Sequence, residues 1–149
     1  MPELTEEEKT KTRQAARQAE RIRAATLLHV SELAEQDERD KVMPFLFRTM
    51  ARYPQAGKIR LWRIDQAIYG TKRKRAIHTV RLTRQAIGDD TAGMPDGLAN
   101  LQWAAGQQKH SDRLAAWLWL MMEREHATTF NPPDGFPFRQ LYDTSGDDK

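Results

Sequence analysis

Apolar residues recur at intervals of three and four along much of the chain, which is the spacing of a buried helix face. In the N-terminal segment this stripe is thin and rich in alanine, and it consists of Ala15, Ala19, Ile22, Thr26, His29 and Leu33. Thr5 and Glu8 have the spacing of a capping box, in which each side chain binds the backbone N–H of the other residue. The pattern predicts one long helix, from about Thr5 to Asp37.

Five shorter helices are expected after it, over residues 44–52, 58–69, 72–87, 96–107 and 111–126. Thr71 and Asp96 are the expected N-caps of the third and fourth, because both side chains can accept a hydrogen bond from a free backbone N–H. Gly70 and Gly88 each follow a predicted helix, where a left-handed residue commonly ends it. The inward-facing residues of the fourth helix are expected to be Leu98, Leu101 and Ala105.

The last predicted helix contains nine consecutive apolar residues, 114–122. Such a run is too short to cross a bilayer and too apolar all round for a surface helix. We therefore expect a central core helix. Trp117 and Trp119 point about 200° apart on a helix. Trp117 is the expected core residue, and Trp119 should face a neighbouring element or a second subunit.

The predicted fold class is all-α, because no stretch alternates apolar and polar residues for long enough to form a sheet. We expect a helical bundle of about six helices in a single domain over residues 1–149. A long charged N-terminal helix (5–37) would precede a helical core (43–127). An irregular tail (128–149) rich in Pro and Gly would follow, since proline interrupts helices.

The composition fits a soluble globular protein: of 149 residues, 39% are hydrophobic and 30% are charged. The chain has no cysteine, which excludes disulfides and thiolate metal ligands. No apolar run approaches the ~20 residues of a membrane span. The first four residues resemble neither the basic nor the apolar part of a secretory signal. We expect a cytoplasmic protein that does not associate with membranes.

Charge is distributed very unevenly along the chain. Residues 41–84 contain 12 basic residues and a single acid, Asp65, and so carry a net charge of +11. Residues 1–40 carry −3 and residues 85–149 carry −5. A basic segment between acidic ends is typical of a polyanion-binding surface. The alternative is that the acidic ends fold back and neutralise the middle.

The densest part of this segment is the run Lys72–Arg75, at the start of a predicted helix. The helix dipole disfavours cations there, and a phosphate ligand would relieve the repulsion. Trp62 and Tyr69 lie among the cations and could stack on bases, or serve in the core and in cation–π contacts. The alternative for the run is a solvated charge cluster, with Arg84 paired to Asp89 or Asp90. The candidate nucleic-acid-binding residues are Lys58, Arg60, Arg63, Lys72, Arg73, Lys74, Arg75, Arg81 and Arg84.

Motifs that support catalysis are missing from the sequence. The four histidines do not pair at helical spacing, and no phosphate-binding or nucleophile motif occurs. His110-Ser111-Asp112 places a hydroxyl near an imidazole, but at a predicted helix start capping is the favoured role. We expect a protein that is not an enzyme and that needs no cofactor or metal. A helix-turn-helix around Gly70 is only weakly indicated, because Ala67 and Gly70 are one residue too close.

The order of elements resembles the small helical subunit of class 1 CRISPR effector complexes, of the type I-E kind and its plasmid-borne type IV relatives. The resemblance covers roughly residues 41–125 and rests on four segments, namely 43–48 (MPFLFR), 75–84 (RAIHTVRLTR), 98–105 and 117–120. It implies an all-α, non-catalytic subunit present in several copies. That subunit would contact the backbone of the guide–target duplex or the displaced strand. The short chain and its long N-terminal helix depart from the family pattern.

Three functions are compatible with these observations. The first is a non-catalytic, backbone-binding small subunit of an RNA-guided ribonucleoprotein, whose partners would be nucleic acid, other protein subunits and further copies of itself. The second is a dimeric DNA-binding regulator of phage or plasmid type. The third is a helical protein–protein adaptor that docks through its N-terminal helix. A regulator would prefer one operator sequence by ~10³-fold or more, whereas a backbone binder would not.

Overall fold

The computed structural model describes residues 3–88, 93–105 and 111–126, and in these ranges the protein is all-α, as predicted. No strand occurs in the described residues; the one β-type contact is an isolated bridge between Arg60 and Asn100. The α-helices are α1 (Glu6–Glu35), α2 (Val42–Arg52), α3 (Leu61–Tyr69), α4 (Arg73–Ala86), α5 (Leu101–Ala105) and α6 (Ser111–Arg124). Short 3-10 helices are η1 (Arg39–Lys41), η2 (Pro54–Lys58) and η3 (Asp96–Leu98). The predicted tail, residues 128–149, lies outside the described residues.

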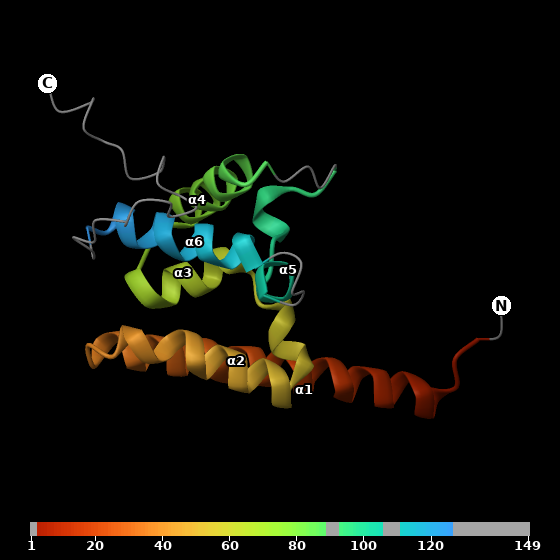
Figure 1. The fold of residues 1–149 in the computed structure, drawn as a ribbon. Helices are drawn as coiled ribbons and strands as arrows, with labels where there is room; N and C mark the ends of the chain where they lie inside the picture. Colours follow the sequence, from red (N-terminus) through yellow and green to blue (C-terminus); the bar gives the residue numbers. More distant parts are fainter. Residues whose placement is uncertain (1–2, 89–92, 106–110, 127–149) are drawn as a thin grey trace, which may run out of the picture.

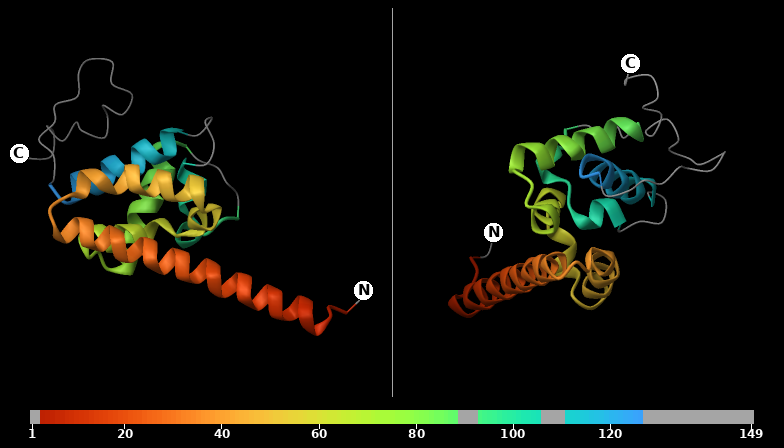
Figure 2. Two further views of the ribbon diagram at one scale, coloured as in Figure 1. Left: turned by 90° about the horizontal axis from the view of Figure 1, so that it is seen from below. Right: turned by 90° about the vertical axis from the view of Figure 1, so that its left-hand side faces the viewer.

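Helix α1 is divided between a free half and a packed half. Its start is the predicted capping box: the Thr5 hydroxyl accepts from the Glu8 N–H at 3.2 Å, and the Glu8 carboxylate accepts from the Thr5 N–H at 2.8 Å. Every residue from 3 to 18 is exposed, and this half projects beyond the rest of the molecule (Figures 1 and 2). The second half packs against α2 and α3, with Val30 and Leu33 buried. α1 therefore belongs to the core over its C-terminal half.

Two short extended segments replace parts of the predicted helices. The Leu61 N–H donates to the Ala99 carbonyl at 2.9 Å, and the Leu101 N–H donates to the Ile59 carbonyl at 2.8 Å. Because these backbones pair, α3 begins at Leu61 instead of Lys58, and the predicted helix 96–107 is divided into η3 and α5. The N-terminal cap of α5 is the side chain of Asn100, which accepts from the Trp103 N–H at 2.8 Å.

Three predicted roles at the helix ends are wrong. Asp96 does not cap a helix, because its carboxylate binds Arg81 and Arg84. Thr71 does not cap α4, because its hydroxyl donates to Asp65 at 2.7 Å. Leu98 does not face inward; it is 45% exposed. The predicted end of α3 is confirmed: Gly70 has φ +68°, which a residue with a side chain rarely adopts.

The α1–α2 hairpin lies against a layer formed by α3–α6 (Figure 1), and buried residues from both parts form one hydrophobic core. Trp117 is its largest fully buried side chain, which confirms the predicted core role, while Trp119 is only half-buried. Three apolar residues at helical spacing along α3 are all buried, namely Leu61, Ile64 and Ile68. α6 is thus the predicted central helix, and it packs against α4 and α5.

A polar centre inside this layer joins three helices. Asp65 on α3 is fully buried, and the Arg124 guanidinium at the end of α6 binds it with both terminal nitrogens, Nη1 to Oδ2 at 2.7 Å and Nη2 to Oδ1 at 2.6 Å. Arg124 also donates to the Thr71 hydroxyl at 2.9 Å and to the Thr79 hydroxyl of α4 at 2.8 Å. Hydrogen bonding to Asp65 raises the pKa of Arg124 above its ordinary value. All four side chains therefore fix α3, α4 and α6 to one another.

We predict that Asp65→Asn lowers the free energy of unfolding by about 3–5 kcal/mol, because the mostly buried Arg124 guanidinium loses its buried, two-pronged carboxylate partner and keeps, in the described residues, only the ion pair with Glu125. Arg124→Met should cost a similar amount. In the double variant the loss should be clearly smaller than the sum of the single losses, since the two groups act as one unit. Denaturant unfolding of the four proteins measures this coupling. Strictly additive losses would show that the pair does not act as a unit.

A second prediction separates the two halves of α1. Deleting residues 1–17 should leave the unfolding temperature nearly unchanged, whereas deleting residues 1–36 should leave an unfolded protein, because the longer deletion removes Val30 and Leu33 from the core. Leu33→Ala should cost about 2–5 kcal/mol. Leu28→Ala is the matched control: Leu28 lies on the same helix and is 63% exposed, so the same change should cost less than about 0.5 kcal/mol.

A folded, cooperative protein lacking residues 1–36 would contradict this division of α1. Circular dichroism at increasing temperature measures each variant. Equal losses from the two leucine substitutions would also contradict it, because burial is the main difference between these two sites.

Candidate nucleic-acid interface

The surface of the basic segment is more positive than its sequence shows. Asp65 is the only acid in residues 41–84, and it is buried and neutralised by Arg124 from another part of the chain. Its carboxylate therefore offers no partner to the exposed cations around it. The alternative that flanking acids neutralise the segment holds only locally in the described residues, for Lys41 with Glu38 and for Arg81 and Arg84 with Asp96.

The run Lys72–Arg75, hereafter the basic cluster, lies where the sequence placed it, at the start of α4. Lys72 is the N-cap and has extended backbone angles, and no side chain binds the free N–H groups of the first turn. All four side chains are exposed, and none forms an ion pair with an acid of the described residues. Cations in this position oppose the helix dipole, so the cluster is not there to stabilise the helix. Free N–H groups and cations together can bind an anion.

Trp62 connects the basic cluster to the cations of α3. The Arg73 guanidinium lies 4.9 Å from its ring centroid and the Arg63 guanidinium lies 5.4 Å from it. The sequence leaves open whether Trp62 stacks on bases or serves in the core and in cation–π contacts, and the structure contains the cation–π contacts. The ring contacts arginines from two different helices, which concentrates positive charge at the α3–α4 corner.

Tyr69 has a role in the structural framework. Its ring is half-buried and lies beneath the guanidinium of Arg39, 5.2 Å away, and near that of Arg124, 5.8 Å away. Burial raises the pKa of Tyr69 above its ordinary value, and the two arginines partly oppose this shift. Because both sequence-predicted aromatics are engaged by arginines, the cation–π alternative describes them better than base stacking.

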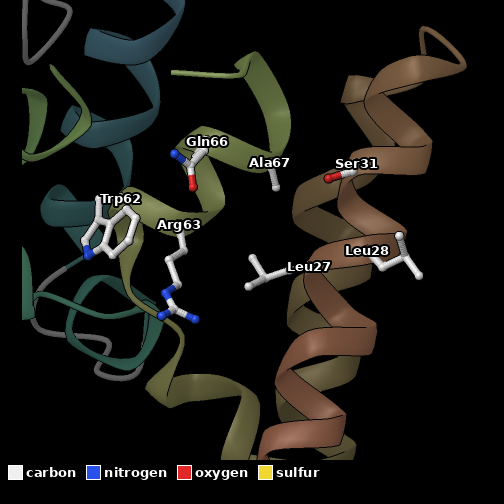
Figure 3. A pocket seen from close by; sticks show the side chains of 7 residues that line it. All are labelled: Leu27, Leu28, Ser31, Trp62, Arg63, Gln66 and Ala67. Atoms are coloured by element: carbon white, nitrogen blue, oxygen red, sulfur yellow. The ribbon is translucent and has the colours of Figure 1, made fainter. Parts of the chain in front are cut away.

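Lys58, Arg60 and Arg63 line a groove that α1 closes on its other side. We call this space, of about 820 Å³, the α1–α3 groove. A smaller adjoining pocket is lined by α1 and α3 residues, and Arg63 borders both spaces (Figure 3). Arg23 on α1 also borders the groove, although it is not among the nine cations predicted from the sequence. Its spacing of four from Ala19 and Leu27 could have revealed that it shares their face.

Arg81 and Arg84 differ from the other seven candidates. The Arg81 Nε lies 3.1 Å from one Asp96 oxygen, and the Arg84 Nη1 lies 2.9 Å from the other. Arg84 also donates to the Met94 carbonyl at 2.7 Å, and its side chain is only 15% exposed. The pairing partner of Arg84 in the described residues is therefore Asp96, whereas the predicted partners Asp89 and Asp90 lie outside them. These two arginines hold the segment around Asp96 against α4.

In the described residues, no group of three or more His, Asp or Glu side chains is arranged to hold a metal ion. No helix in those ranges has the length and apolar character that a membrane crossing requires. His110 of the sequence analysis lies outside the described residues. No protein-family model, curated protein or solved structure matches this chain.

Proposed function

We propose that this protein is a non-catalytic subunit that binds the sugar–phosphate backbone of nucleic acid within an RNA-guided, CRISPR-type ribonucleoprotein. The observation that carries the proposal is the group of exposed cations on α3, α4 and the segment before α3, which have no acidic partner in the described residues. They are Lys58, Arg60, Arg63, Lys72, Arg73, Lys74 and Arg75.

Contacts from such a surface are electrostatic and independent of sequence. Phosphates are the groups that exposed lysines and arginines bind most readily on nucleic acid, and these contacts position a protein without reading bases. The first turn of α4 presents a row of cations, where a base-reading helix presents a mixture of polar side chains. This composition favours a backbone binder over an operator-specific regulator.

The assignment to a ribonucleoprotein rests on the resemblance of residues 41–125 to small CRISPR subunits. The projecting half of α1 supports an assembled state, because sixteen exposed residues offer a long surface to other subunits or further copies. A helix that is polar all round typically bridges between structural units. We propose a cytoplasmic complex in which several copies lie along the nucleic acid.

The test is the salt dependence of binding to random-sequence nucleic acid. Replacing Lys72, Arg73, Lys74 and Arg75 by alanine should weaken binding and reduce the slope of log K against log salt. Each lost phosphate contact contributes ~0.9 to that slope for duplex DNA and ~0.7 for single strands. The fold should be unchanged, because all four side chains are exposed.

A matched comparison removes two charges at each of two places. Lys74→Ala with Arg75→Ala should reduce affinity and slope, whereas Arg48→Ala with Arg52→Ala on α2 should have a much smaller effect. If the two double variants bind alike, the basic cluster is not the site. Preference for one DNA sequence by ~10³-fold would instead support a regulator. Purification without any RNA-containing particle from the native host would oppose the ribonucleoprotein assignment.

A further inference from the structure

The α1–α3 groove has the chemistry of a binding site for one polyanionic strand. We propose that a single strand of nucleic acid, and not a duplex, lies along this groove between α1 and the segment Lys58–Arg63. The inference rests on the proposed function, and it adds the strandedness of the ligand and the place on α1 where that ligand binds.

The two walls of the groove differ in character. One wall is basic and is formed by Lys58, Arg60 and Arg63. The opposite wall is the face of α1, which presents small and apolar side chains together with one cation and one acid. Its residues are Ala16, Ala19, Glu20, Arg23, Ala24 and Leu27.

Charge in the groove favours an anion. Four cations and a single acid, Glu20, border it, and none of these five side chains forms an ion pair with another described residue. Arg60 donates to the Gly97 carbonyl at 3.4 Å, a long contact that leaves its other nitrogens free to bind phosphate. Cations that face one another across a groove repel, and a bound phosphodiester chain would remove that repulsion.

The composition of the two walls favours a single strand. The α1 wall, residues 16 to 27, extends over about 16 Å at about 1.5 Å per residue. In a duplex the bases are paired and stacked inside the helix and present only their edges in the grooves, so their faces cannot lie against an alanine-rich wall. One extended strand fits, with phosphates on the basic wall and bases against the alanine-rich wall.

The groove also has continuations at both ends. Arg13 lies three residues before Ala16, so it extends the same face onto the projecting half of α1. At the other end Arg63, which lies beside Trp62 in Figure 3, borders the groove and contacts the Trp62 ring. The same ring also contacts Arg73 of the basic cluster. A strand leaving the groove past Arg63 would therefore approach the start of α4 beside Trp62 and Arg73.

The experiment compares an oligothymidylate with a mixed-sequence duplex of equal length, using fluorescence anisotropy at several salt concentrations. Arg23→Ala should weaken single-strand binding severalfold and reduce the salt slope by about 0.7, the value for one phosphate contact. Arg21→Ala is the control, because Arg21 lies two residues from Arg23 on α1 but borders a separate pocket, on the side that faces α2. Glu20→Gln should strengthen binding.

A steric pair of variants tests occupancy without changing charge. Ala16→Trp places a large ring in the groove and should weaken single-strand binding severalfold. Ala15→Trp is the control, since Ala15 is equally exposed on the same helix but does not border the groove. Both sites lie in the projecting half of α1, so neither change should alter the unfolding temperature.

The outcomes distinguish this inference from the proposed function. Tighter binding of the single strand, with losses confined to the groove variants, supports both. Equal binding of both ligands, with Ala16→Trp behaving as wild type and the basic-cluster variant still defective, overturns the groove and leaves the proposed function standing. Absence of binding to either ligand at low salt overturns both.

Discussion

The ion pair between Asp65 and Arg124 is the interaction on which the rest of the structure depends. It joins residues 59 positions apart in the sequence and connects α3 to α6, and the hydroxyls of Thr71 and Thr79 bring α4 into the same centre. A buried carboxylate is costly unless it is neutralised and hydrogen-bonded, and here both conditions are met. The pair also removes the only acid of the basic segment from the surface. One interaction thus fixes the layer of helices and makes its exterior positive.

The start of α4 shows how tertiary contacts can override local preference. Its first turn carries four cations and has no capping side chain, both of which disfavour a helix end. Thr71, which could have capped it, binds Asp65 instead, and Gln66 donates to the Thr71 carbonyl at 3.3 Å. The helix is held from its buried side, by Ala76, Thr79, Val80 and Thr83. Its exposed end is therefore available for binding anions.

Helix α1 links the structural and the proposed binding roles. The face that packs on α3 near Leu27 continues, toward the N-terminus, as the wall of the α1–α3 groove, so one stripe of residues changes from core to groove along the helix. Small side chains make this possible, because alanine leaves space where leucine would fill it. The alanines on this face offer too little apolar area to bury the whole helix, and the same small side chains leave the space that forms the groove.

The sequence by itself determined the helical class, the long capped first helix, the end of α3 at Gly70 and the exposed position of the basic cluster. These follow from periodicity, capping chemistry and charge, which act between neighbouring residues. Tertiary structure alone decided that Asp65 meets Arg124, that Asp96 binds two arginines instead of capping a helix, and that Arg23 faces Lys58 across a groove. These side chains are 12 to 59 residues apart in sequence. No local pattern encodes such pairings, because they arise only when helices pack.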